Sequence, residues 1–88
     1  MIRNPEFMMQ SVADTLVVVP VGTAAKAFPG MITLNATGGY LWELLEQPQT
    51  QESLTDALLE RYEVTREQAA ADVADFVTRL LPTTAILE

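Results

Sequence analysis

The sequence predicts an α+β domain in which a three-stranded antiparallel sheet is followed by a three-helix bundle. Three observations carry this prediction. The first half contains three short runs rich in β-branched and other apolar residues. The second half has apolar residues three and four positions apart, as in amphipathic helices. Between them, the stretch 30–45, GMITLNATGGYLWELL, runs from a strand pattern into a helix pattern with almost no loop.

The strands are expected at residues 7–12, 15–21 and 31–34. The run TLVVVPV at 15–21 is the clearest, because β-branched residues favour strands. Ala13 and Asp14 fit a tight turn before it. Pro20 has no amide hydrogen and must lie near the strand end or at an unpaired position.

The segments beside the strands have weaker patterns. Residues 1–5 show no pattern and are expected to form a loose lead-in. Residues 22–30 contain two glycines and a proline, which favours a loop that returns the chain for the third strand. Three consecutive strands with short connections then favour an antiparallel meander.

The helices are expected at residues 36–46, 51–62 and 66–81. Asn35 and Thr50 are suitable N-caps, because their side-chain oxygens can accept from the free amides of a first turn. For the third helix, Thr65 and Gln68 have the spacing of a capping box. Pro82 would end that helix, and residues 85–87 either return as a short strand or pack as a tail.

Two glycines fall inside the first predicted helix. Gly38 and Gly39 each cost about 1 kcal/mol relative to alanine in a helix interior. Their presence predicts that another backbone approaches closely there.

The order of three strands and three helices is that of a winged-helix-like domain. We expect residues 1–88 to form a single domain, with its core from about residue 7.

Composition removes many enzyme classes from consideration. The chain of 88 residues has no cysteine and no histidine, so thiolate chemistry and the commonest general base are absent. The acidic pairs Asp72 with Asp75 and Glu60 with Glu63 have the spacing of a solvated helix face more than of a catalytic or metal site. We therefore expect no catalytic residue, no metal and no cofactor.

Charge and hydropathy restrict the partners. The net charge is −7, and eight of the twelve acidic residues follow residue 50. Because phosphate backbones are bound by arrays of lysine and arginine, nucleic acid is not expected as a partner. No apolar run approaches the roughly 20 residues that span a bilayer, and the N-terminus lacks the pattern of a signal peptide. We expect a cytoplasmic protein that does not bind membranes.

Residues 31–38, MITLNATG, together with residues 41–45, LWELL, resemble the signature of the PqqD family, the pyrroloquinoline quinone biosynthesis protein D group. The resemblance extends over about residues 7–88. The first motif is fairly specific, and the later one is close to a generic amphipathic helix. This later part matches at Leu54, Leu58, Tyr62, Asp72, Val73, Phe76 and Leu80.

The resemblance implies a non-catalytic peptide chaperone. Such domains bind the leader of a ribosomally made precursor peptide and present it to a modifying enzyme, often a radical SAM enzyme. The product would be pyrroloquinoline quinone or a related peptide natural product. In this domain type the leader adds as a strand to the edge of the third strand and lies beside the third helix. Carried onto this sequence, the expected peptide-binding residues are Met31, Ile32, Thr33, Leu34, Asp72, Val73, Phe76 and Arg79.

Other interpretations of the same residues stay open at this stage. Val73 and Phe76 lie on the apolar stripe of the third helix and could simply be core. Tyr40 and Trp42 could pack under the sheet or serve an interface. A winged-helix DNA-binding regulator has the same element order, although its recognition helix would be basic. A structural dimerisation module would pair two copies through the third-strand edge, so a homodimer is a further partner to consider.

Overall fold

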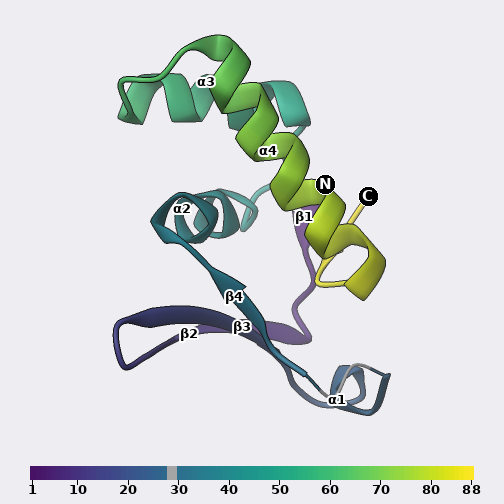
Figure 1. Cartoon of the computed structure of the whole chain (residues 1–88). Coiled ribbons are helices and arrows are strands. Elements are labelled where there is room, and N and C mark those ends of the chain that lie inside the picture. Colours follow the sequence, from purple (N-terminus) through teal and green to yellow (C-terminus); the bar gives the residue numbers. More distant parts are fainter. Residues whose placement is uncertain (28–29) are drawn as a thin grey trace.

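The protein is described here by a computed structural model, covering residues 1–27 and 30–88. Its central sheet contains β2 (Phe7–Val12), β3 (Thr15–Pro20) and β4 (Ile32–Leu34), antiparallel and in the order β2-β3-β4. Three helices follow: α2 (Ala36–Leu44), α3 (Gln51–Arg61) and α4 (Arg66–Leu80). In Figure 1, α2 lies between this sheet and the α3–α4 pair. The α+β, winged-helix-like prediction is confirmed.

A two-residue turn sets the register of the sheet. Ala13 and Asp14 both have positive φ angles, 49° and 67°, which is the conformation of a type I′ turn. The predicted tight turn is therefore confirmed, and it pairs Val12 with Thr15. Pro20 lies at the last position of β3, opposite Phe7. Its missing amide hydrogen therefore removes no hydrogen bond from the interior of the strand.

The sheet presents one face to the helices. Side chains opposite one another across paired strands share a face, so Phe7, Val18, Ile32 and Leu34 point the same way. All four are buried and belong to the hydrophobic core. Met8, Val12 and Met31 are exposed, consistent with the alternation of side chains along a strand.

The core is completed by the apolar stripes of the helices. Trp42 is 2% exposed, which places it in the core and answers the question left open by the sequence. Tyr40 is half-buried and meets Tyr62 edge to face, with ring centroids 6.3 Å apart, while the Arg61 guanidinium lies 4.4 Å from the Tyr40 ring centroid. The largest fully buried side chains of the helical layer, besides Trp42, are Leu41, Leu45, Leu54, Leu58, Val73 and Leu80.

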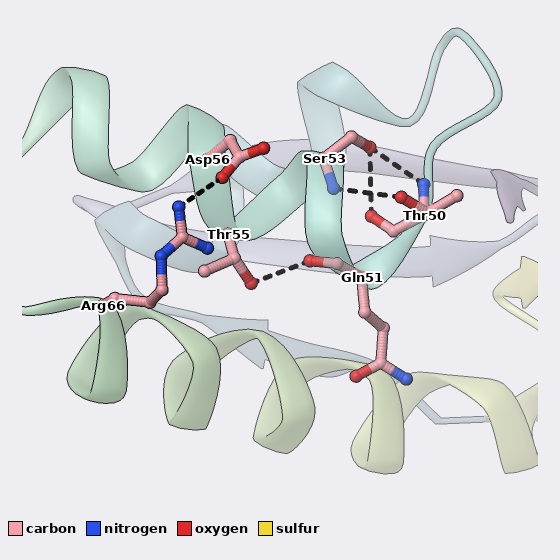
Figure 2. A network of polar contacts seen from close by, with 6 residues as sticks. All are labelled: Thr50, Gln51, Ser53, Thr55, Asp56 and Arg66. Atoms are coloured by element: carbon pink, nitrogen blue, oxygen red, sulfur yellow. Dashed lines mark hydrogen bonds and ion pairs between the residues drawn. The ribbon is translucent and has the colours of Figure 1, made fainter.

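The cap of α3 is a reciprocal capping box, drawn in Figure 2. Thr50 Oγ1 accepts from the Ser53 amide at 3.0 Å, and the Thr50 amide donates to Ser53 Oγ at 2.9 Å. At α4, Thr65 accepts from the Gln68 amide at 3.1 Å as predicted. The return bond predicted for that box, from the Thr65 amide to the Gln68 side chain, is not formed; the Gln68 side chain extends toward Asp72, to which its Nε2 donates.

The N-terminal segment corrects the sequence-based expectation of a loose lead-in. Residues Ile2–Arg3 form β1, which pairs antiparallel with β5 (Ile86–Leu87). Figure 1 shows the two chain ends close together beside α4. The Arg3 amide also donates to the Leu45 carbonyl at 3.0 Å. The partner of β1 lies at the opposite end of the chain, so no local pattern could predict this pairing. Of the two options for residues 85–87, the short strand is correct.

The segment expected to be a loop contains a helical turn. Residues Ala24–Ala27 form α1, and Ala24 reaches the core, while residues 28–29 of the expected loop lie outside the described part. At the other end of the bundle, α4 passes directly into the 3₁₀ helix η1 (Leu81–Thr83), which contains Pro82.

The two glycines of α2 face side chains of the sheet, so the expected backbone contact was wrong. A Cβ atom on Gly39 would lie 2.5 Å from Leu16 Cδ1. A Cβ atom on Gly38 would lie 3.4 Å from Leu34 Cβ and 3.3 Å from Asn35 Oδ1. Gly39 thus allows α2 to pack closely on β3, whereas a Cβ atom on Gly38 would only crowd the capping oxygen of Asn35.

We predict that Thr50→Ala lowers the free energy of unfolding by about 1 kcal/mol, because the first-turn amides of α3 lose their acceptor. Urea denaturation at neutral pH would measure this.

The matched control is Asp56→Asn, which removes the ion pair with Arg66 beside the same helix (Figure 2). Its side chains are 53% and 63% exposed, and we expect a change below about 0.5 kcal/mol. Equal losses from the two variants would contradict this ranking.

Candidate functional site

The free edge of β4 is the first component of the candidate site. In a two-residue hairpin the closing pair, here Val12 and Thr15, exchanges hydrogen bonds. The alternation along β3 then turns the backbone groups of Leu16 and Val18 toward β4, where their partners are Leu34 and Ile32. Thr33, between those partners, points its N–H and C=O away from the sheet.

The side chains of β4 alternate between the core face and the exposed face of the sheet. Ile32 and Leu34 are 8% and 5% exposed and face the helices, whereas the Thr33 side chain is exposed on the other face. Met31, just before the strand, is 63% exposed. The strand therefore anchors itself by its side chains and leaves one backbone edge available.

Beside this edge lies a hollow of about 80 Å³, which we call the α4 groove. Its floor is apolar and its rim is polar. One wall comes from the end of β4 and the first turns of α2, and the other comes from α4. The residues that line it are Leu34, Asn35, Thr37, Gly38, Leu41, Asp72, Asp75, Phe76 and Arg79.

Asn35 fixes the wall that β4 and α2 share. Its Oδ1 accepts from the Gly38 amide at 2.7 Å, which caps α2 as the sequence predicted. Because Asn35 directly follows Leu34, the cap holds the start of α2 against the end of β4. The orientation of the free edge relative to the helices therefore depends on this junction.

Arg79 joins the two walls of the groove. Its Nη2 donates to the Thr33 carbonyl at 2.9 Å, across 46 residues of sequence. This bond agrees with the β3–β4 hydrogen-bond pattern, since the Thr33 oxygen must point away from β3 to accept from α4. Asp72 and Asp75 stand on the same wall as Arg79, so the charged rim of the groove carries two acids and one base.

The structure brings together part of the predicted peptide-binding set. Leu34, Asp72, Phe76 and Arg79 line the α4 groove. Val73 is fully buried, as its core interpretation required, and lies outside the lining. Ile32 is buried on the core face, and Met31 and Thr33 contribute to the edge rather than to the groove.

Sequence reasoning left five of the groove's lining residues out of the site: Asn35, Thr37, Gly38, Leu41 and Asp75. Asn35 and Thr37 belong to the α2 N-terminus, and Leu41 lies one turn further along α2. Asp75 could have been found, because it is three residues after Asp72 and four before Arg79 and so shares their helix flank. The Arg79 bond to Thr33 has no signal in the sequence.

A second, more open hollow of about 580 Å³ lies along β2, the other edge strand of the sheet. Its lining is mainly apolar, with Arg3 and Glu46 as charged members, and includes Phe7, Met9 and Trp42. It does not include the β4 edge.

Within residues 1–27 and 30–88, no three side chains of metal-binding type come together.

None of the helices in the described part of the chain combines the length and apolar character needed to cross a bilayer.

The model of the family described as Coenzyme PQQ synthesis protein D matches residues 15–82, from the start of β3 to the end of the helical bundle. The chain belongs to the PqqD family. The match includes β4, the capped start of α2 and the whole of α4, which are the elements that form the edge and the groove. No curated protein matches the chain.

Two solved structures share the fold of this PqqD family member. One is TbiB1 in complex with the TbiA(beta) leader peptide, with a TM-score of 0.74 and 25% identity over 97% of this chain and 93% of that one. The other is lasso peptide synthetase B1 complexed with the leader peptide, with a TM-score of 0.73 and 23% identity over 98% and 95% of the chains. At 23% identity, the similarity to lasso peptide synthetase B1 supports the fold alone.

We predict that the Thr33 amide exchanges its hydrogen with solvent much faster than the amides of Ile32 and Leu34. Those two amides are bonded within the β3–β4 ladder, whereas the Thr33 amide points outward. Amide hydrogen exchange followed by NMR would measure all three in one sample. Equal protection of the three amides would contradict the assigned edge.

Proposed function

We propose that this protein binds the leader segment of a ribosomally made precursor peptide by strand addition to β4, without catalysing a reaction itself. Residues 1–88 act as one recognition domain, with the guest peptide lying between β4 and α4. The observation that carries the proposal is the outward-facing backbone of Thr33 beside the α4 groove. Membership of the PqqD family and the leader-peptide complex of the structural neighbour at 25% identity support it.

Strand addition suits this edge for a physical reason. An edge strand presents unpaired N–H and C=O groups, and an extended peptide can bond to them whatever its sequence. β4 is only three residues long, so the guest gains few backbone bonds from it. Selectivity must then come from side chains of the guest that enter the neighbouring groove.

The groove accepts a small number of such side chains. Leu34, Leu41 and Phe76 supply an apolar floor, and a volume of about 80 Å³ suits one side-chain tip. Within the proposed site, Met31 and Thr33 supply the edge, and Asp72 and Arg79 the polar wall. Ile32 and Val73 are buried and hold the two walls in place from beneath.

Charge favours neutral or basic guests. The chain carries a net charge of −7, and the groove rim holds Asp72 and Asp75 against Arg79. A winged-helix DNA regulator is not favoured, since α4 carries three acidic residues, Glu67, Asp72 and Asp75, against Arg66 and Arg79.

The proposed role requires a second protein that acts on the bound peptide. This partner is a peptide-modifying enzyme, of the radical SAM class or another, acting in the biosynthesis of pyrroloquinoline quinone or a related peptide product. The proposed compartment is the cytoplasm.

Peptides that tile the short open reading frames encoded beside this gene would test the proposal. We predict that one of them binds, with NMR shifts concentrated at Met31–Leu34 and on the groove side of α4. Strand addition further predicts that single backbone N-methyl groups weaken binding at alternate peptide residues, because every second amide of a strand faces its partner.

Thr33→Pro is the matching change in the protein. It removes the outward N–H, which is worth about 1 kcal/mol or about fivefold in affinity, without breaking a bond to β3. Ser11→Pro is its control, because Ser11 pairs with Leu16 and has its amide at the opposite, β2 edge. If Ser11→Pro weakened peptide binding and Thr33→Pro did not, the peptide would bind at the β2 edge and not at β4. Tight binding of duplex DNA in place of peptide would overturn the function.

A further inference from the structure

Arg79 occupies the position that a guest strand needs. The guest of the proposed function lies between β4 and α4, and the Arg79 side chain crosses this space to reach the Thr33 carbonyl. That carbonyl is the outward acceptor at the centre of β4. Although a carbonyl oxygen can accept two hydrogen bonds, a guest strand beside β4 needs the space that the guanidinium crosses, so the guanidinium has to move.

A second position for the guanidinium exists on the same helix. Asp75 precedes Arg79 by four residues, the spacing at which acidic and basic side chains meet on a helix surface. Both side chains line the α4 groove and both are exposed. Asp75 makes no hydrogen bond or ion pair within the described residues, so its carboxylate can receive the guanidinium.

Asp72 is not equivalent to Asp75. Its Oδ1 accepts from Gln68 Nε2 at 2.8 Å, and it lies seven residues from Arg79. The two acids of the groove rim therefore differ in their partners. Asp72 is already bonded to Gln68, whereas Asp75 is available one helical turn before Arg79.

We propose that Arg79 is a displaceable cap on the free edge of β4 and that Asp75 is the site to which its guanidinium moves when a guest strand binds. This inference rests on strand addition at β4 and assigns Arg79 and Asp75 as affinity-determining residues of that site. In the empty protein the cap satisfies the outward Thr33 carbonyl and blocks pairing with unsuitable strands, including the β4 edge of a second copy.

The cap has a definite cost for binding. The guest must replace the charge-assisted hydrogen bond between Arg79 and the Thr33 carbonyl, which weakens its binding. The new Arg79–Asp75 ion pair offsets part of this loss. Removing the arginine should therefore tighten peptide binding, and removing only its second site should weaken it. A basic guest that simply contacted both residues through charge would give the same signs, but its two effects would then be independent of each other.

A double-mutant cycle tests the proposal with the peptide identified by tiling. We expect Arg79→Ala to bind about three- to tenfold more tightly than the wild type, as for the loss of one competing hydrogen bond. Asp75→Asn should bind about twofold more weakly, as for the loss of one exposed i,i+4 ion pair. In the Arg79→Ala background, Asp75→Asn should have no effect.

Asp72→Asn is the matched control, because it changes the same charge on the same groove wall. Its effect should be the same with and without Arg79. Equal weakening by Asp75→Asn in both backgrounds would overturn the proposal, since Asp75 would then act on the peptide directly. Weaker binding by Arg79→Ala would also overturn it.

A measurement on the free protein separates this proposal from the proposed function. Arg79→Ala should move the Thr33 carbonyl ¹³C resonance upfield, because the carbonyl loses its hydrogen bond. In the peptide complex, Asp75→Asn should shift the Arg79 Nε–H signal, which it leaves unchanged in the free protein. If no tiled peptide binds, the proposed function fails. If peptide binds but these signals and affinities are uncoupled, only the cap fails.

Discussion

The site depends on the alternation of groups along three residues of β4. Ile32 and Leu34 place their side chains in the core and their backbone groups in the ladder with β3, so the strand is held from one face and one edge. Thr33 is left with an exposed side chain and an outward backbone. A slip of one residue in this register would turn the Thr33 side chain to the core face and its backbone groups toward β3. The type I′ turn at Ala13 and Asp14 fixes the β2–β3 end of that register.

The helices convert this edge into a site with two walls. The Asn35 cap begins α2 immediately after β4, and Gly39 lets the helix lie close against β3. Phe76 and its buried neighbours on α4 pack into the core, which directs Asp72, Asp75 and Arg79 toward the edge. The apolar flank of α4 therefore contributes to stability, and its polar flank is the one proposed to recognise the guest. The guest is proposed to contact polar groups whose loss leaves the core intact.

Much of this arrangement was predictable from local patterns. The strand 31–34, the Asn35 cap, the helix 36–46 and the buried stripe of α4 all follow from alternation, capping chemistry and helical spacing, and the structure has each within two residues. The parts that were missed depend on distant partners. The β1–β5 pairing joins the two ends of the chain, and the glycines of α2 face Leu16 and Leu34 rather than another backbone. The Arg79 bond spans 46 residues. No periodicity encodes such contacts. Asp75 differs from them, because its spacing from Asp72 and Arg79 already places it on the same helix flank.

The central claim is that a guest peptide becomes a fourth strand beside β4. Isotope-filtered NOE spectra of the labelled protein with an unlabelled bound peptide test it most directly. The account predicts close contacts between backbone protons of the peptide and those of Met31 and Thr33, repeating at every second residue. Backbone contacts confined to β2, or peptide contacts only to the outer faces of α3 and α4, would contradict it.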